Sequence, residues 1–310
     1  MKINKPKFWD KKNSIASFIL LPFSFAVLIF IFLKRKITQT NKFKIPIVCI
    51  GNIYIGGTGK TPASIFLANE ILKSGKSPVI LRKFYSNQVD ECNLIKANFK
   101  NLILDKNRTS GIKKAMKNKY DIVILDDGFQ DYKLKKDLNI ICFNSNQLIG
   151  NGLVIPSGPL RERLNALKYA QIVLINGNKN NHFEKKILKI NENLNIFYSR
   201  YKPTNIEEFK NKKLLAIAGI GNPENFFKLI EDNNLEISKK LIFPDHYSFS
   251  LHEIQKIMDK AKKENLNVIM TEKDYYKLNH FQITGIKYLK ISLEIENKEK
   301  FLSKVKEIYV

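Results

Sequence analysis

Residues 45–75 join an apolar run, a glycine-rich loop and a helical pattern in that order, an arrangement that few folds accommodate. The run IPIVCI at 45–50 is short and rich in β-branched residues, as in a buried strand. Residues 63–75 carry apolar side chains at helical spacing and end in glycine, a usual helix stop. Between them lies GNIYIGGTGKTP at 51–62. We therefore predict strand, loop and helix in the order that parallel sheets use to bind phosphate.

The glycines of this loop let the backbone N–H groups curl around an anion. The predicted nucleotide-binding residues are Gly56, Gly57, Thr58, Gly59, Lys60 and Thr61. Lys60 is placed to reach the β- and γ-phosphates, and the Thr61 hydroxyl is placed to bind Mg²⁺. The strict phosphate-loop pattern begins with glycine, whereas Tyr54 occupies that position here. A plain glycine turn is the alternative, but the flanking strand and helix favour the phosphate loop.

A second apolar strand, predicted at 121–125, runs directly into Asp126 and Asp127. In a parallel sheet a carboxylate at this position lies beside the metal of a bound nucleotide, so we predict both aspartates as metal ligands with Thr61. An ordinary Asp-Gly turn is the alternative. Further strands are predicted at 78–82, 138–143 and 171–175, alternating with helical segments. The expected fold is α/β, a doubly wound parallel sheet of the P-loop NTPase type.

The alternation of strands and helices restarts after about residue 190, which predicts a second α/β domain. Its strands are expected near 195–201, 213–218, 239–243, 267–271 and 286–293. The turn at Gly219 and Gly221 has Glu224 where a dinucleotide fingerprint needs glycine, so we predict a tight turn and not a second nucleotide site. The expected domains are 1–36 (an N-terminal helix), 37–190 (the P-loop domain) and 191–310.

Residues 15–33 form a run of nineteen without a charge, close to the roughly 20 residues that a membrane span needs. The run ends in the basic residues 34–36, which do not suit a signal-peptide cleavage site, so the segment is expected to stay on the protein. The segment contains Pro22 and two serines, which weaken a straight span, and basic residues flank it on both sides. Two alternatives therefore remain open: a helix that spans the membrane once, and a helix that lies in the cytoplasmic leaflet. Both predict a membrane-associated helix against an anionic surface.

The formal net charge of +24 requires an acidic partner to be considered. Only six of the 53 basic residues are arginine, and base recognition relies on arginine forks, so no nucleic-acid partner is predicted. The three cysteines and four histidines lack metal-ligand spacing, which argues against a structural metal. A monomer is the expected state.

Six stretches together resemble the tetraacyldisaccharide 4'-kinases of lipid A synthesis, and they follow that family's order over nearly the whole chain. They are GNIYIGGTGKTP at 51–62, DIVILDDGFQDYKL at 121–134, GNGLVIPSGPLRE at 150–162, AIAGIGNPENFF at 216–227, FPDHYSFS at 243–250 and TEKDYYKL at 271–278. The resemblance implies two α/β/α domains and an enzyme on the cytoplasmic face of the inner membrane. Such an enzyme uses ATP and Mg²⁺ to phosphorylate the 4'-hydroxyl of an acylated disaccharide phosphate lipid, giving lipid IVA.

The resemblance also implies roles for individual residues. It places Arg161 and Glu162 near phosphate and metal, and it makes Asp90 the catalytic base with His246 as its support. Of the family's GDEP motif this chain keeps only the acidic pair, and the segment from Arg82 to Asp90 is shorter than is usual in the family. Glu91, or a different residue, is therefore the alternative base. The predicted catalytic residues are thus Asp90, His246, Lys60 and Arg161, and the predicted metal ligands are Thr61, Asp126, Asp127 and Glu162.

A membrane-anchored P-loop regulatory NTPase is the alternative function, since it too would combine an anchor, a phosphate loop and an aspartate pair. Guanine-specific members of that class usually carry [NT]-K-x-D. In the nearest segment, 271–274, Glu272 stands in place of the lysine, which favours the kinase.

Overall fold

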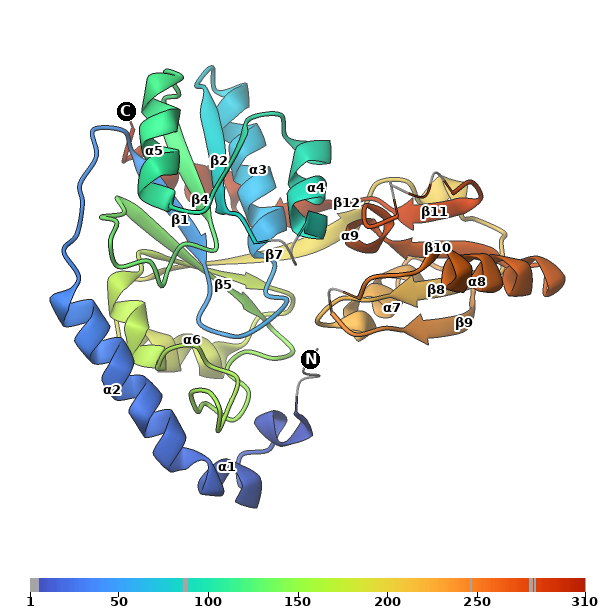
Figure 1. Ribbon diagram of the computed structural model, residues 1–310, viewed down its shortest axis with the longest axis horizontal. Coiled ribbons are helices and arrows are strands. Elements are labelled where there is room, and N and C mark those ends of the chain that lie inside the picture. The colour runs from blue at the N-terminus through green and yellow to red at the C-terminus, as the bar shows by residue number, and fades with distance from the viewer. Residues whose placement is uncertain (1–5, 86–88, 246, 279–280, 282, 310) are drawn as a thin grey trace. The chain divides into compact units, whose positions relative to one another are not determined.

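The computed structural model describes residues 6–85, 89–245, 247–278, 281 and 283–309 (Figure 1). The chain divides into two compact units. The larger takes in the described residues between 5 and 84, between 101 and 200, and between 294 and 310. The smaller takes in those between 85 and 100 and between 201 and 293. The described residues between 85 and 100, expected within the P-loop domain, therefore belong to the smaller unit, and those between 294 and 309 belong to the larger one.

An eight-stranded sheet forms the centre of the larger unit, in the strand order β12-β7-β6-β5-β1-β4-β2-β3. From β7 to β3 in this order, each strand pairs in parallel with its neighbours. The strands are β1 (Ile47–Gly51), β2 (Pro78–Lys83), β3 (Leu102–Asp105), β4 (Ile122–Asp126), β5 (Leu138–Asn144), β6 (Ile172–Asn176), β7 (Asn195–Pro203) and β12 (Ile291–Ile295). The chain places β2 to β4 on one side of β1 and β5 to β7 on the other. The winding thus reverses at β1, where open α/β sheets bind their ligands.

Helices cover both faces of this sheet. Helix α3 (Lys60–Lys73) packs on β1, β2 and β4, and α5 (Arg108–Lys117) packs on β2 and β3. The aromatic ring of Phe183 in α6 (Asn181–Leu188) contacts Phe143, and that of Phe301 in α10 (Lys298–Lys306) contacts Phe66 of α3. The doubly wound α/β fold that the sequence predicts is confirmed.

The smaller unit has a second parallel sheet, with the strand order β11-β10-β8-β9. Its elements are α4 (Val89–Asn98), β8 (Leu214–Ala218), α7 (Pro223–Glu231), β9 (Ile237–Ile242), α8 (Leu251–Lys263), β10 (Asn267–Thr271), α9 (Glu272–Tyr275) and β11 (Ile286–Leu289). Two separate apolar clusters, one around Phe227 of α7 and one around Ile254 of α8, form its core. The predicted second α/β unit is therefore present.

The strands differ from the expectation in three respects. The single strand expected at 286–293 is two strands, β11 and β12, which belong to different sheets. Strand β7, expected in the second domain, pairs with β6 in the large sheet. Strand β3 was not predicted. Sheet membership is decided by hydrogen-bonded neighbours, which are distant in sequence, so the position of a strand along the chain does not reveal it.

The N-terminal apolar run forms two helices, α1 (Ile15–Ile19) and α2 (Leu21–Ile37), after a short 3-10 helix η1 (Lys7–Asp10). This N-terminal segment packs on the loop around residues 154–156 of the same unit: Ser24 Oγ donates to the carbonyl of Val154 at 2.7 Å, and Trp9 Nε1 donates to that of Pro156 at 2.9 Å. Exposed apolar side chains on these helices include Phe18, Ile19, Phe23, Phe25, Ile29, Phe30, Phe32 and Leu33. Within the described part of the chain, no helix has both the length and the apolar character to cross a membrane.

Candidate active site

The glycine-rich loop joins the C-terminal end of β1 to α3. Gly56 and Gly59 have φ angles of +96° and +87°, a region that glycine enters without strain. The Asn52 amide donates to Thr58 Oγ1 at 2.9 Å and to the Gly56 carbonyl at 3.3 Å, which fixes the curl of the loop. Gly59 is the N-cap of α3 and supplies no side chain to the first helical N–H groups. Such a helix N-terminus suits a phosphate.

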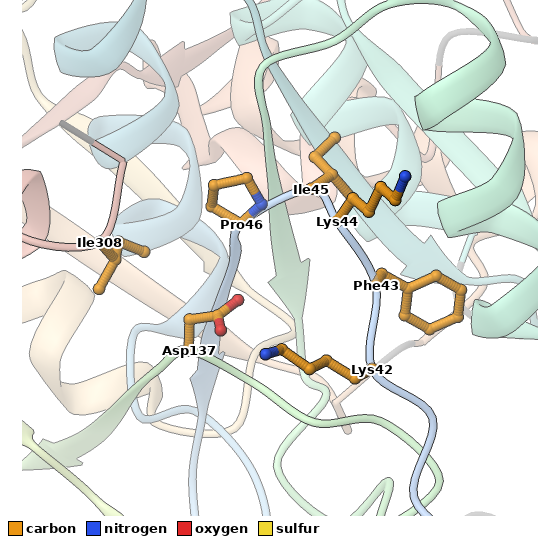
Figure 2. Close-up of a pocket in the computed structure, with 7 residues that line it drawn as sticks. All are labelled: Lys42, Phe43, Lys44, Ile45, Pro46, Asp137 and Ile308. Atoms are coloured by element: carbon orange, nitrogen blue, oxygen red, sulfur yellow. The ribbon is translucent and has the colours of Figure 1, made fainter.

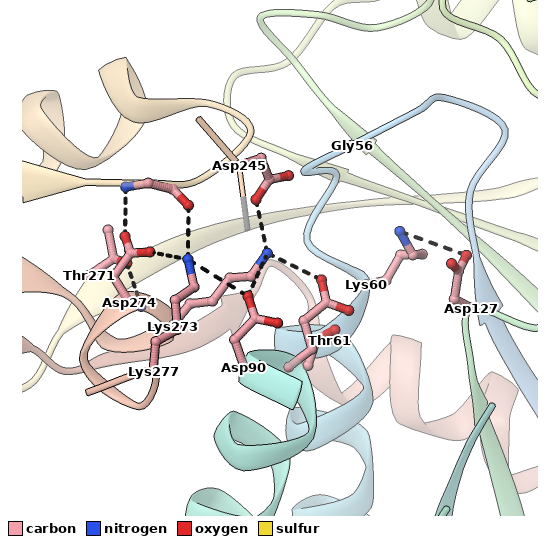
Figure 3. Close-up of polar contacts among 12 residues, drawn as sticks. Gly56, Lys60, Thr61, Asp90, Asp127, Asp245, Thr271, Lys273, Asp274 and Lys277 are labelled. Atoms are coloured by element: carbon pink, nitrogen blue, oxygen red, sulfur yellow. Dashed lines mark hydrogen bonds and ion pairs between the residues drawn. The ribbon is translucent and has the colours of Figure 1, made fainter. Parts of the chain in front are cut away.

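Three predicted residues, Lys60, Asp127 and Arg161, meet beside the C-terminal end of β4. Figure 3 shows two of them, Lys60 and Asp127. Lys60 Nζ lies 3.8 Å from Asp127 Oδ1, and Arg161 Nη1 donates to the same oxygen at 2.8 Å. Burial alone would raise the pKa of Asp127, but the charges of Lys60 and Arg161 outweigh burial and lower that pKa to about 2. Asp127 is therefore ionised at neutral pH, between two cations that carry the charge needed to bind phosphoryl oxygens.

Asp126 is fully buried and is held by side chains from β2 and α3. Thr61 Oγ1 and Ser64 Oγ donate to its two oxygens at 3.2 and 3.1 Å, and the guanidinium of Arg82 pairs with it. Arg82 is the register partner of Asp126 in the parallel pair of β2 and β4, so the sheet itself brings the charges together. Arg82 and Ser64 were not singled out from the sequence, although Arg82 ends a predicted strand.

The loop before Arg161 is aligned with the segment that leads into the glycine loop. The Arg161 N–H donates to the carbonyl of Ile53 at 2.7 Å, and the Ile55 N–H donates to that of Pro159 at 2.9 Å. Between them Tyr54 is buried in an apolar cluster with Leu160 and Val154. The position that the strict pattern gives to glycine is thus taken by a packing residue.

Glu162 meets the end of helix α2. Its side chain is buried, and Oε2 accepts a hydrogen bond from Arg35 Nη2 at 2.7 Å. The Arg35 guanidinium lies 4.5 Å from the ring centroid of Tyr132 and 4.0 Å from that of Tyr169. The predicted role of Glu162 as a metal ligand stays a prediction.

The polar groups around the glycine loop fit Mg²⁺. They are oxygen donors, the Thr61 hydroxyl and the carboxylates of Asp126 and Asp127, and Mg²⁺ usually takes one or two carboxylates together with water and phosphate oxygens. Asp127 is the more accessible carboxylate, since its side chain is 22% exposed whereas that of Asp126 is 0% exposed. Among the described residues no three His, Cys, Asp or Glu side chains gather as a metal cluster.

The predicted base, Asp90, lies in the first turn of α4 in the smaller unit (Figure 3). Its Oδ2 is 3.6 Å from Lys273 Nζ and 3.8 Å from Lys277 Nζ. Both lysines belong to the stretch TEKDYYKL, but the sequence gave no reason to single them out. His246 lies outside the described residues.

A pocket of about 540 Å³ in the larger unit is lined by residues 42–46, Asp137 and Ile308 (Figure 2). It lies beside the N-terminal end of β1, whereas open α/β sheets bind ligands at the C-terminal ends of their strands. The Asp137 carboxylate accepts the Ile47 N–H at 2.8 Å, which fastens β1 to the start of β5. We assign no ligand to this pocket.

A glycine loop at the reversal point of a parallel sheet, followed by Lys60 and faced by an aspartate pair, defines a P-loop nucleotide-binding protein. The family model described as tetraacyldisaccharide-1-P 4'-kinase matches residues 16–309. A tetraacyldisaccharide 4'-kinase of Pelagibacter ubique is 41% identical over 98% of both chains. That of Francisella tularensis subsp. novicida is 33% identical over 93% of this chain and 98% of its own length. The chain therefore belongs to the tetraacyldisaccharide 4'-kinase family, and it is a kinase.

The fold agrees with a solved member. The crystal structure of LpxK from Aquifex aeolicus in complex with ATP matches with a TM-score of 0.75 and 22% identity, covering 96% of this chain and 100% of that chain. The resemblance stated from the six sequence stretches is thus confirmed.

Proposed function

We propose that this protein transfers the γ-phosphate of ATP to the 4'-hydroxyl of tetraacyldisaccharide 1-phosphate, a lipid A precursor, to form lipid IVA. The observation that carries the proposal is the pair of cations, Lys60 and Arg161, on Asp127 beside the glycine loop. In phosphoryl transfer most of the catalysis is alignment and neutralisation of charge on the phosphoryl oxygens. Lys60, Arg161 and the N–H groups of the loop supply that charge from fixed positions.

The proposal assigns one set of residues to binding the phosphates and metal, and another to accepting the proton of the sugar hydroxyl. Thr61, Asp126, Asp127 and Glu162 would hold Mg²⁺, which would supply positive charge to the phosphates when bound. Asp90 accepts the proton of the attacking hydroxyl, and His246 supports it. Buried partners fix the side chains of Asp126 and Asp90, so little reorganisation is needed during the reaction.

We also propose that α1 and α2 hold the enzyme to the cytoplasmic face of the inner membrane. Their docked side carries Ser24, whereas exposed phenylalanines lie on the remaining surface and the exposed Lys34 and Lys36 lie in the last turn of α2. Apolar side chains next to basic residues suit the boundary between acyl chains and anionic headgroups. No nucleic acid takes part in the proposal, and the enzyme acts as a monomer.

The test is transfer of labelled γ-phosphate from ATP to tetraacyldisaccharide 1-phosphate by the purified full-length protein with Mg²⁺. Lys60→Met should reduce transfer by at least a hundredfold because it removes a phosphate-facing charge. Lys73→Met is the matched control, since Lys73 lies on the same helix and its side chain is 70% exposed. Hydrolysis of ATP without transfer to the lipid would favour the regulatory NTPase and overturn the proposal.

The base is tested separately by single-turnover transfer. Asp90→Asn should slow the chemical step by roughly 10² to 10⁴, the usual contribution of a general base, with little change in ATP binding. Glu91→Gln is the matched variant on the same turn of α4. A normal rate for Asp90→Asn together with a slow Glu91→Gln would move the role to Glu91 without affecting the assignment as a kinase.

A further inference from the structure

A cluster of two lysines and four carboxylates surrounds the first turn of α4 in the smaller unit (Figure 3). Its members are Asp90, Glu91, Asp245, Lys273, Asp274 and Lys277. The residues come from α4, from the segment after β9, and from α9 with the turn that follows it. The cluster thus ties three segments that are distant in sequence, and it contains the proposed base.

Of the two lysines, Lys277 is committed mainly to the turn after β8. Its Nζ lies 2.6 Å from Asp274 Oδ1 and donates to the Gly219 carbonyl at 3.3 Å. The other Asp274 oxygen accepts the Gly219 N–H at 2.7 Å and the Thr271 hydroxyl at 2.7 Å. Asp274 is fully buried, so Lys277 balances a structural charge and reaches Asp90 only at 3.8 Å.

Lys273 instead faces the carboxylates of α4. Its Nζ lies 3.3 Å from Glu91, 3.6 Å from Asp90 and 3.0 Å from Asp245. Burial alone would lower the pKa of Lys273, but Glu91, Asp245 and Asp90 outweigh burial and raise it above its ordinary value. Lys273 therefore keeps its charge throughout the physiological range, and its side chain is only 16% exposed.

We propose that Lys273 is a positioning residue for the proton-accepting carboxylate: its ammonium group fixes Asp90 on α4 and keeps it in the charged form. This inference rests on the proposed function, in which Asp90 accepts the sugar proton. A cation within 4 to 6 Å of a carboxylate favours its charged form by 1 to 3 pH units. Glu91 and Asp245 oppose that effect, Lys277 adds to it, and Asp274 is balanced by Lys277. Glu272, also on α9, accepts a hydrogen bond at 2.9 Å from Asn98, which lies at the opposite end of α4 from Asp90.

The test is the pH dependence of kcat/KM for the lipid, measured with the full-length enzyme and Mg-ATP. Without the ammonium group the base takes up its proton at higher pH, so Lys273→Met should move the midpoint of the acidic limb upward by at least about one unit. Lys273→Arg keeps the charge and should stay within about 0.3 unit of wild type. Lys262→Met, an exposed change on α8, is the matched control and should leave the profile unchanged.

The result that overturns the inference is a Lys273→Met enzyme that is slower by the same factor at every pH, with an unmoved midpoint, because a merely structural role predicts that pattern. If Lys273→Met is recovered unfolded, the variant Asp245→Asn is measured in its place. Removal of this opposing negative charge should lower the midpoint of the acidic limb, and an unchanged midpoint rejects the proposal. Failure of the proposed function is distinguishable, since it would appear as absent lipid phosphorylation by the wild-type enzyme.

Discussion

Replacement of Arg82 by leucine tests how the buried carboxylate of Asp126 is maintained. Asp126 is 0% exposed and Arg82 is 3% exposed. The hydroxyls of Thr61 and Ser64 also bond Asp126, but each such neutral bond contributes only about 1 kcal/mol. Removing one partner of a buried ion pair costs about 3–5 kcal/mol, because the other charge loses its compensation. We expect the free energy of unfolding to fall by that amount in Arg82→Leu.

Urea denaturation of the purified full-length variant measures this loss, and thermal unfolding should shift downward by about 6–20 °C at roughly 2–4 °C per kcal/mol. Arg200→Leu is the matched control. Arg200 Nε lies 3.7 Å from Glu294, but the Arg200 side chain is 71% exposed, so its loss should cost less than about 1 kcal/mol.

The double variant Arg82→Leu/Asp126→Leu separates stability from activity. With both charges gone, apolar side chains fill the site and much of the lost stability should return. Phosphoryl transfer should be absent in the double variant, since Asp126 is one of the proposed metal ligands. A loss in Arg82→Leu no larger than that in Arg200→Leu would refute the argument that the ion pair holds Asp126 in place.

Three further predictions address the loop, its aspartate and the membrane helices. Tyr54→Gly restores the strict loop pattern but removes a buried ring, so the free energy of unfolding measured by urea denaturation should fall by about 3–5 kcal/mol. The KM for ATP should not become lower. Asp127→Asn should lower the free energy of unfolding by about 2 kcal/mol at neutral pH, because the pKa of Asp127 is lower in the folded than in the unfolded state. In acid unfolding, the difference in stability between this variant and wild type should vanish as the pH falls from about 4 towards 2. Phe25→Ser with Phe30→Ser should weaken sedimentation with anionic vesicles, whereas Met116→Ser on α5 should not; equal binding contradicts the proposal for α1 and α2.

Much of the nucleotide-binding site around the glycine loop could be predicted, because its features follow from residues that are neighbours in the sequence. The strand before Gly56, the helix after Lys60 and the acidic end of β4 each follow from neighbouring residues, and parallel strands then bring those ends to one edge. The helical and apolar character of the N-terminal segment followed from composition in the same way, but its division into α1 and α2 was not predicted.

The docking of the N-terminal helices was different. In the sequence, Ser24 was expected to weaken a membrane span, but in the structure it makes a hydrogen bond that holds α2 against the loop at Val154.

Other features were decided only by tertiary structure. Arg82 reaches Asp126 through the register of β2 and β4, Arg35 reaches Glu162 across more than a hundred residues, and Lys273 gathers carboxylates from α4 and the segment after β9. Likewise, the single strand predicted at 286–293 is divided between two sheets. Local pattern fixes which strand or helix a residue joins. Which distant charges meet depends on sheet register and packing, and these are set by contacts between segments that the linear order keeps apart.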